Sequence, residues 1–143
     1  MITKKAEYAV AALTDLARQG EGVQTTTRAI ALRQRIPNNL IVQIIGTLRE
    51  AGWVSSTRGP AGGVALTRNP AEISLRKVIE LLDGPIGITR CLLQDKPCRD
   101  QVSCALRGVW AEAQDRMLEV LERVTIGDLA RVEVENWKPD LLS

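Results

Sequence analysis

The sequence predicts a mainly α-helical protein with one small β-hairpin, in which a winged helix-turn-helix head is followed by a long helix. Three observations support this fold class. Hydrophobic residues make up 45% of the 143 residues but aromatic residues only 3%, so the core must consist of Leu, Ile, Val and Ala, which pack well between helices. Apolar residues recur at helical spacing in several segments. A glycine-rich turn separates two short runs of alternating apolar residues.

A first helix is expected from Lys4 to Gln19, where apolar residues recur at helical spacing and where Gly20 and Gly22 close the segment. Its apolar residues are Tyr8, Ala9, Leu13, Leu16 and Ala17.

Two shorter helices are expected next, in TTTRAIALRQR and in NLIVQIIGTLREAG, separated by IPNN. Thr25 or Thr26 can cap the second helix, in which Ile30 and Leu32 are expected to face inward. The third helix is expected to stop at Gly52. Two short helices joined by a tight turn predict a helix-turn-helix.

The third helix has an apolar stripe and an opposite, largely polar face. The expected inward stripe is Leu40, Ile44 and Leu48. The expected outward residues are Asn38, Asn39, Val42, Gln43 and Gly46. Side-chain amides can read adenine through paired hydrogen bonds in the major groove, whereas a merely solvated helix would carry Glu and Lys there. The outward face therefore predicts contact with a DNA duplex.

The segment WVSSTRGPAGGVALTR predicts a β-hairpin, the wing, over about residues 53–67. Arg58 lies near its tip and has the reach to enter a minor groove, although a solubilising surface charge is an equally simple role. No Gly-Lys-Ser/Thr follows the glycines and the loop leads into a strand, which argues against a nucleotide-phosphate cradle.

The charge distribution also fits a head that binds a polyanion. Residues 1–70 contain nine Lys and Arg against four Asp and Glu, whereas residues 91–143 contain seven against ten. A double-stranded DNA operator is therefore the expected partner. The candidate DNA-contacting residues are Thr26, Arg28, Asn38, Asn39, Val42, Gln43, Arg49, Ser56, Arg58 and Gly59.

After a helix in ISLRKVIELLDG, a long amphipathic helix is expected from about Val102 to Val124. Its apolar residues form an a/d seam, which needs a partner helix and predicts a homodimer; packing on the chain's own first helix is the alternative. Thr125 and Asp128 have capping-box spacing, which predicts a short terminal helix before the tail ENWKPDLLS. The seam consists of Leu106, Trp110, Ala113, Met117, Val120 and Val124.

The amino terminus is charged and lacks the apolar run of a signal peptide, and no apolar stretch reaches the about 18 residues of a membrane span. A cytoplasmic location, where thiols stay reduced, is expected. No catalytic arrangement is evident, because the chain has no His and no Ser, Cys or Lys has an evident base partner. An enzyme is not expected.

The three cysteines, Cys91, Cys98 and Cys104, are spaced C-x6-C-x5-C ahead of the long helix. A zinc site usually has a tighter C-x2-4-C pair and often a histidine. A disulfide with one thiol left over is disfavoured by the expected compartment. Three thiolates fit an iron-sulfur cluster, 2Fe-2S or 4Fe-4S, which Lys96 and Arg99 could help to hold. The fourth ligand must be a carboxylate, a backbone or solvent oxygen, or a small thiol.

The hairpin segment TRGPAGGVALTRNPAEISLRKVIELLDG, the helix-turn-helix before it, the opening TKKAEYAV, the three cysteines and the following VW resemble the IscR/NsrR family of iron-sulfur winged-helix transcriptional regulators. The resemblance covers about residues 2–130. It implies a homodimer with crossed long helices, a DNA-binding head and a cluster whose state alters operator affinity. It also implies that Arg58 is the wing arginine and that the early recognition-helix positions are Asn38, Asn39, Val42 and Gln43.

This chain departs from the family pattern at the cluster ligands. Its first cysteine interval is one residue longer than in most members, and Arg107 stands where the IscR branch has a histidine ligand. The NsrR branch uses a carboxylate from the other subunit, just before the tyrosine of the first helix. Glu7, before Tyr8, matches that place and is the expected fourth ligand. Its alternative role is an exposed charge favoured by the helix macrodipole.

These observations predict a winged helix-turn-helix DNA-binding domain at residues 1–84, a cysteine cluster-binding loop at 85–104, and a dimerisation helix with its tail at 105–143. The expected function is a homodimeric regulator, with a repressor's role, whose cluster senses redox state, nitric oxide or iron-sulfur supply. One alternative is a cluster-free winged-helix regulator that uses its thiols as the sensor. The other is an iron-sulfur electron-transfer protein, which would leave the wing and the amide-rich helix without a role.

Overall fold

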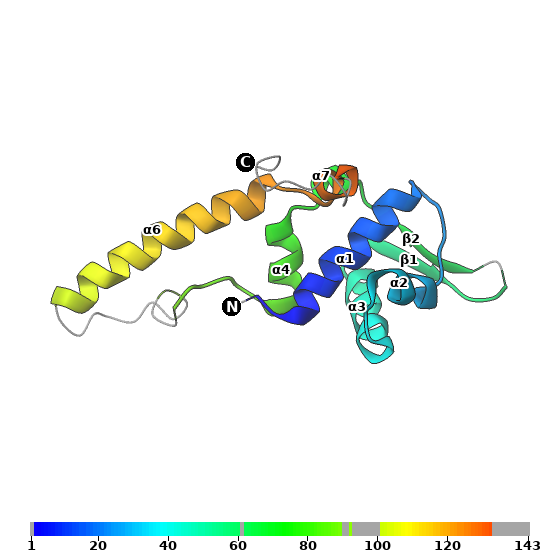
Figure 1. The fold of residues 1–143 in the computed structure, drawn as a ribbon, viewed down its shortest axis with the longest axis horizontal. Coiled ribbons are helices and arrows are strands. Elements are labelled where there is room, and N and C mark those ends of the chain that lie inside the picture. Colours follow the sequence, from blue (N-terminus) through cyan, green and yellow to red (C-terminus); the bar gives the residue numbers. More distant parts are fainter. Residues whose placement is uncertain (1, 61, 90–91, 93–100, 133–143) are drawn as a thin grey trace.

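A helical head with a two-stranded wing carries one long helix that projects away from it (Figure 1). The computed structural model describes residues 2–60, 62–89, 92 and 101–132. The mainly helical fold with a small hairpin confirms the predicted fold class. The elements are α1 (Lys4–Gln19), α2 (Thr27–Gln34), α3 (Asn38–Glu50), β1 (Val54–Thr57), β2 (Gly63–Leu66), the 3-10 helix η1 (Pro70–Glu72), α4 (Leu75–Asp83), α6 (Gln101–Arg123) and α7 (Ile126–Arg131).

Helix α1 is the centre of the head and contacts α2, α3, α4, α7 and β2. The side chain of Thr3 caps its start by accepting a hydrogen bond from the backbone N–H of Ala6, at 3.2 Å. The helix has the predicted bounds, although Tyr8 and Ala17 are only half-buried. Its buried apolar residues are Ala6, Ala9, Ala12, Leu13 and Leu16.

Helix α2 corrects one sequence prediction. Ile30 is fully buried as predicted, but Leu32 is 70% exposed. Positions two residues apart lie about 200° apart around a helix, so Ile30 and Leu32 cannot both face the core. Ala31 takes the second buried position instead. Thr26, not Thr25, caps the helix.

Helix α3 buries a broader face than predicted. Ile44 and Leu48 are buried as expected, but Leu40 is only half-buried. Ile41 and Ile45 complete the buried face, because three- and four-residue spacings together make an apolar stripe wider than a single row.

The wing is an antiparallel hairpin in which Val54 pairs with Leu66 and Ser56 pairs with Val64. A further segment joins its edge: the N–H of Thr25 donates to the carbonyl of Val64 at 3.0 Å, and the N–H of Val64 donates back at 2.7 Å. The wing is thus attached to the residues that lead into α2.

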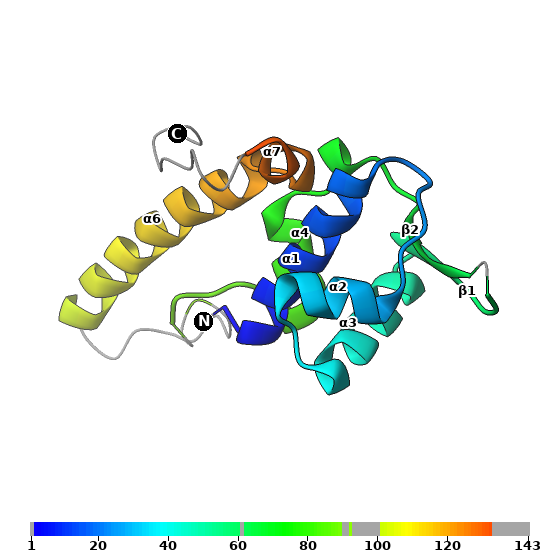
Figure 2. The ribbon, with the colours of Figure 1, turned by 45° about the vertical axis from the view of Figure 1, so that its right-hand side comes forward.

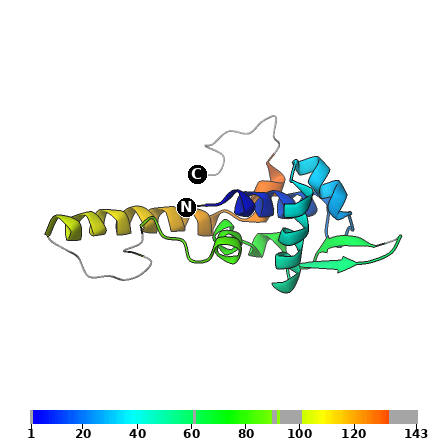
Figure 3. The same ribbon diagram turned by 90° about the horizontal axis from the view of Figure 1, so that it is seen from below.

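Helix α7 fixes the carboxyl end of the described chain to the head. The guanidinium of Arg18, at the end of α1, donates to the carbonyls of Leu129, Ala130 and Val132, which satisfies the free carbonyls at the end of α7. At its start, Thr125 and Asp128 form the predicted capping box. Helix α6 contacts α4 near the head and extends away from it in every view (Figures 1, 2 and 3).

A buried ion pair joins α1 to α2. Arg33 donates from Nε and Nη2 to the two carboxylate oxygens of Asp15, at 2.9 and 2.7 Å, and Gln34 donates to the same carboxylate at 3.0 Å. The Asp15 side chain is 3% exposed. Burial by itself raises the pKa of Asp15, but the hydrogen bonds from Arg33 and Gln34 outweigh it, so this pKa lies below its ordinary value of 3.8.

Replacing Asp15→Asn should lower the free energy of unfolding at pH 7 by about 2 kcal/mol, because the charged hydrogen bonds to Arg33 weaken. The folded state lowers the pKa, so this contribution is complete above the ordinary pKa and is lost as the pH falls through the folded value. Urea unfolding should therefore show a smaller difference in the free energy of unfolding between wild type and variant at pH 3 than at pH 7. Asp115→Asn, on an exposed residue of α6, is the control. A gap that stays constant with pH would contradict the assignment.

Candidate nucleic-acid interface and cysteine segment

The outward face of α3 is exposed as predicted except at Gly46, which is half-buried. Asn38, Asn39 and Gln43 are exposed, and the side chain of Val42 is 65% exposed between them. The two asparagines lie in the first turn, whose free N–H groups carry the positive end of the helix dipole. Arg49 is exposed in the last turn. This face presents amide donors and acceptors, an apolar side chain and a cation to solvent.

Lys5 of α1 reaches this same face and was not among the predicted residues. Its Nζ lies 3.4 Å from Oε1 of Gln43. The only sequence signal was a basic residue at the start of the first helix, and the fold alone brings the two side chains together.

At the start of α2, Thr26 and Arg28 are exposed. The hydroxyl of Thr26 accepts a hydrogen bond from the N–H of Ala29 at 3.0 Å. Thr26 therefore has a capping role in the fold, while Arg28 presents its charge to solvent.

The wing extends from the head next to α3, with which β1 is in contact (Figure 2). Ser56, Arg58 and Gly59 are all exposed. Gly59 has a φ of 103°, in the left-handed region that favours glycine. A Cβ at Gly62 would collide with the carbonyl oxygen of Thr57, so this position also requires glycine. The glycines thus make the tight turn next to Arg58.

The cysteine segment is described only at its end. Cys91 and Cys98, two of the predicted thiol ligands, lie outside the described residues. Cys104 lies in the first turn of α6, is exposed, and is disulfide-bonded. Among the described residues, no three His, Cys, Asp or Glu side chains lie close enough to hold a metal ion.

Glu7, the predicted fourth ligand, lies in the first turn of α1 with its side chain 58% exposed. Its carboxylate forms an ion pair with Nζ of Lys4 at 3.2 Å. The start of α1 lies in the head beside α4, whereas the start of α6 lies at the far end of the molecule (Figures 1 and 3). A single chain thus keeps Glu7 and Cys104 apart.

The predicted seam of α6 is largely open. Leu106, Trp110 and Val120 are exposed, Met117 is half-buried, and Val124 is buried against the head. A mainly apolar pocket of ≈ 610 Å³ lies between Met117 of α6, the end of α4 with the following residues 84–88, and Ile2, which precedes α1. Within the described residues, no helix is long and apolar enough to cross a bilayer.

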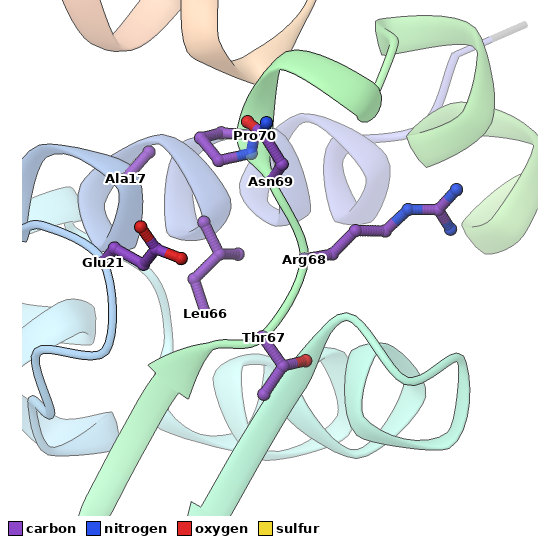
Figure 4. Close-up of a pocket in the computed structure, with 7 residues that line it drawn as sticks. All are labelled: Ala17, Glu21, Leu66, Thr67, Arg68, Asn69 and Pro70. Atoms are coloured by element: carbon purple, nitrogen blue, oxygen red, sulfur yellow. The ribbon is translucent and has the colours of Figure 1, made fainter.

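A second pocket, of ≈ 300 Å³, lies behind the base of the wing (Figure 4). Glu21 lines one side, and the guanidinium of Arg68 points away from the cavity. The pocket therefore offers one carboxylate without an opposing cation and is no evident binding site.

Comparison with known proteins gives consistent matches over most of the chain. The sequence model of the Rrf2 family, described as an iron-dependent transcriptional regulator, matches residues 2–132. The HTH-type transcriptional regulator IscR of Escherichia coli is 34% identical over 129 residues, which cover 90% of this chain and 78% of the relative. CymR, titled the global cysteine regulator of B. subtilis, superposes with a TM-score of 0.77 at 30% identity, covering 91% of this chain and 95% of that one. IscR of T. potens superposes with a TM-score of 0.71 at 28% identity, covering 96% and 92%.

Proposed function

Because the chain belongs to the Rrf2 family of transcriptional regulators, we propose that it is a homodimeric DNA-binding regulator whose operator affinity is controlled by an iron-sulfur cluster on its cysteine segment. The observation that carries the proposal is the exposed amide face of α3 beside an arginine-bearing wing, in a chain with three clustered cysteines. In this proposal residues 1–84 bind DNA, residues 85–104 hold the cluster and residues 105–143 form the dimer.

The open seam of α6 supports the dimer. A helix with Leu106, Trp110 and Val120 exposed on one face leaves apolar surface in water, which is unfavourable until another helix covers it. The pocket beside Met117 continues this surface towards the start of α1. A second copy of α6 laid along the seam would cover both.

The donor set fits an iron-sulfur cluster. In the reduced protein, in which the disulfide of Cys104 is open, three thiolates are available, and the chain has no histidine, so an oxygen or small thiol must supply the fourth position. Glu7 is solvent-exposed, forms an exposed ion pair with Lys4, and lies in the first turn of α1, whereas Cys104 lies in the first turn of α6, and the starts of these two helices are far apart in one chain. These features support Glu7 of a second copy as the fourth ligand. A bound cluster would supply a redox- and nitric-oxide-sensitive centre, with redox state, nitric oxide or iron-sulfur supply as the signal.

The thiol-sensing alternative keeps specific support. Cys104 is disulfide-bonded, and the similar protein CymR is titled a cysteine regulator. In this alternative the head and dimer stay the same, and oxidation of the thiols replaces cluster chemistry as the signal.

Substitutions of the proposed DNA-contacting residues should have two different effects, a loss of base selectivity or a loss of affinity for every sequence. Asn39→Ala should relax selectivity at one base pair, at a cost of about 1–3 kcal/mol, because base edges are read by amides. Arg58→Ala should weaken binding to all sequences and reduce the slope of log affinity against log salt by about 1. Fluorescence anisotropy on a selected duplex, at several salt concentrations, measures both. Arg116→Ala on α6 is the control, and an equal loss in that variant would count against the assigned interface.

Trp110→Glu should convert the dimer to a monomer, because a charge on the apolar seam cannot be desolvated without a partner. Sedimentation velocity gives the mass, and circular dichroism verifies that the helices remain. Asp115→Lys changes charge on the opposite face of α6 and should leave the dimer intact. A Trp110→Glu protein that stays dimeric would rule out the seam as the interface.

Anaerobically purified protein should show iron-sulfur absorption and bound iron, and Glu7→Ala should lose or destabilise this absorption while Glu21→Ala keeps it. A mixed dimer of one Glu7→Ala chain and one Cys104→Ala chain tests the trans ligand. It should hold one intact cluster per dimer, because the wild-type Glu7 and Cys104 then meet across the interface. No cluster in the wild type would favour the thiol sensor, and an unaltered cluster in Glu7→Ala would exclude Glu7.

A further inference from the structure

Two adjacent lysines at the start of α1 take different partners. Nζ of Lys4 pairs with the carboxylate of Glu7 at 3.2 Å and lies 5.4 Å from the centre of the Tyr8 ring. Nζ of Lys5 instead lies 3.4 Å from Oε1 of Gln43, on the exposed face of α3. The two side chains carry the same charge, and only Lys5 touches the residues proposed to read DNA.

The contact with Lys5 favours one orientation of the Gln43 amide. An ammonium group has three donors and no acceptor, so the amide must turn its oxygen towards Lys5. The amide nitrogen, with two N–H donors, is then left for an approaching ligand. The backbone carbonyl of Gln43 accepts from the hydroxyl of Thr47 at 3.1 Å, within the helix, so it adds no outward acceptor.

The amide oxygen has two lone pairs, and the one left free lies beside the ammonium group, which repels a donor such as the amino group of adenine and attracts acceptors. The Lys5–Gln43 pair therefore prefers a different base from a free amide. Paired hydrogen bonds from glutamine to adenine need a donor to N7 and an acceptor for the amino group at N6. Guanine presents two acceptors in the major groove, N7 and O6. We propose that Lys5 is a specificity-determining residue that makes Gln43 read guanine in preference to adenine. This inference rests on the proposed DNA-binding function.

The competing role for Lys5 is a phosphate contact. A phosphate contact would add affinity for every sequence and would raise the salt dependence of binding, without changing the preferred base. Base preference is therefore the property that separates the two roles.

The test is a selection from a random duplex library with full-length protein, both cluster-loaded and aerobic, for wild type, Lys5→Met, Lys4→Met and Gln43→Ala. The base pair whose preference disappears in Gln43→Ala is the pair that Gln43 reads. At that pair Lys5→Met should raise the affinity for adenine relative to guanine by about tenfold, within the range of one paired contact. Lys4→Met removes the same charge and should leave the preference unchanged. In Lys5→Met with Gln43→Ala, the pair should behave as in Gln43→Ala alone.

Three outcomes would overturn the inference while leaving the regulator intact. The first is an unchanged base preference in Lys5→Met, and the second is an equal shift of base preference in Lys4→Met. The third is a loss of affinity in Lys5→Met that is the same for every sequence and comes with a weaker dependence of affinity on salt. Wild-type protein that selects no sequence in either form would instead overturn the DNA-binding proposal itself. Thermal unfolding of each variant, which should match wild type, shows that folding does not cause the change.

Discussion

The arrangement of the head depends on the buried ion pair between Asp15 and Arg33. A carboxylate that is 3% exposed is tolerable only when donors surround it, and Arg33 and Gln34 provide them. The same guanidinium donates to the hydroxyl of Thr25 at 2.9 Å, and the backbone of Thr25 pairs with Val64 of the wing. One charged contact therefore joins α1, α2 and the wing, and the exposed face of α3 that we propose reads DNA is held next to them.

Local signals were enough to predict most of the elements. The bounds of α1 and the capping box at Thr125 follow from residues within a turn of each end, and glycines determine the wing turn. Leu32 was misplaced because hydrophobicity alone does not define which face of a short helix meets the core. The contacts of Asp15 with Arg33 and of Lys5 with Gln43 join residues 18 and 38 positions apart, which no local pattern specifies.

Membership of the family does not determine which residues would bind a cluster in this chain. The chain is similar to a regulator named IscR and to one titled a cysteine regulator, so a shared fold supports both a cluster and a thiol chemistry. The lack of histidine, and Arg107 three residues after Cys104, remove imidazole from the donors that could complete a cluster. An oxygen donor in its place would exchange more readily than a thiolate or an imidazole. In the proposed regulator, this lability is what exposes the centre to its signal.

The start of α1 contacts the end of α4, the proposed ligand Glu7 and the exposed face of α3. Thr3 bonds through its N–H and hydroxyl to Asp83, the last residue of α4 before the segment that leads to the cysteines. Lys4 pairs with Glu7, and Lys5 contacts Gln43. A change in the partner of Glu7 would therefore act on a turn that also contacts α3, the helix that we propose reads DNA. Only about 1.4 kcal/mol of difference between two arrangements of this turn is needed for a tenfold change in operator affinity. Exposed contacts of the kind seen here are individually worth up to about 1 kcal/mol, so a few of them acting together supply that difference.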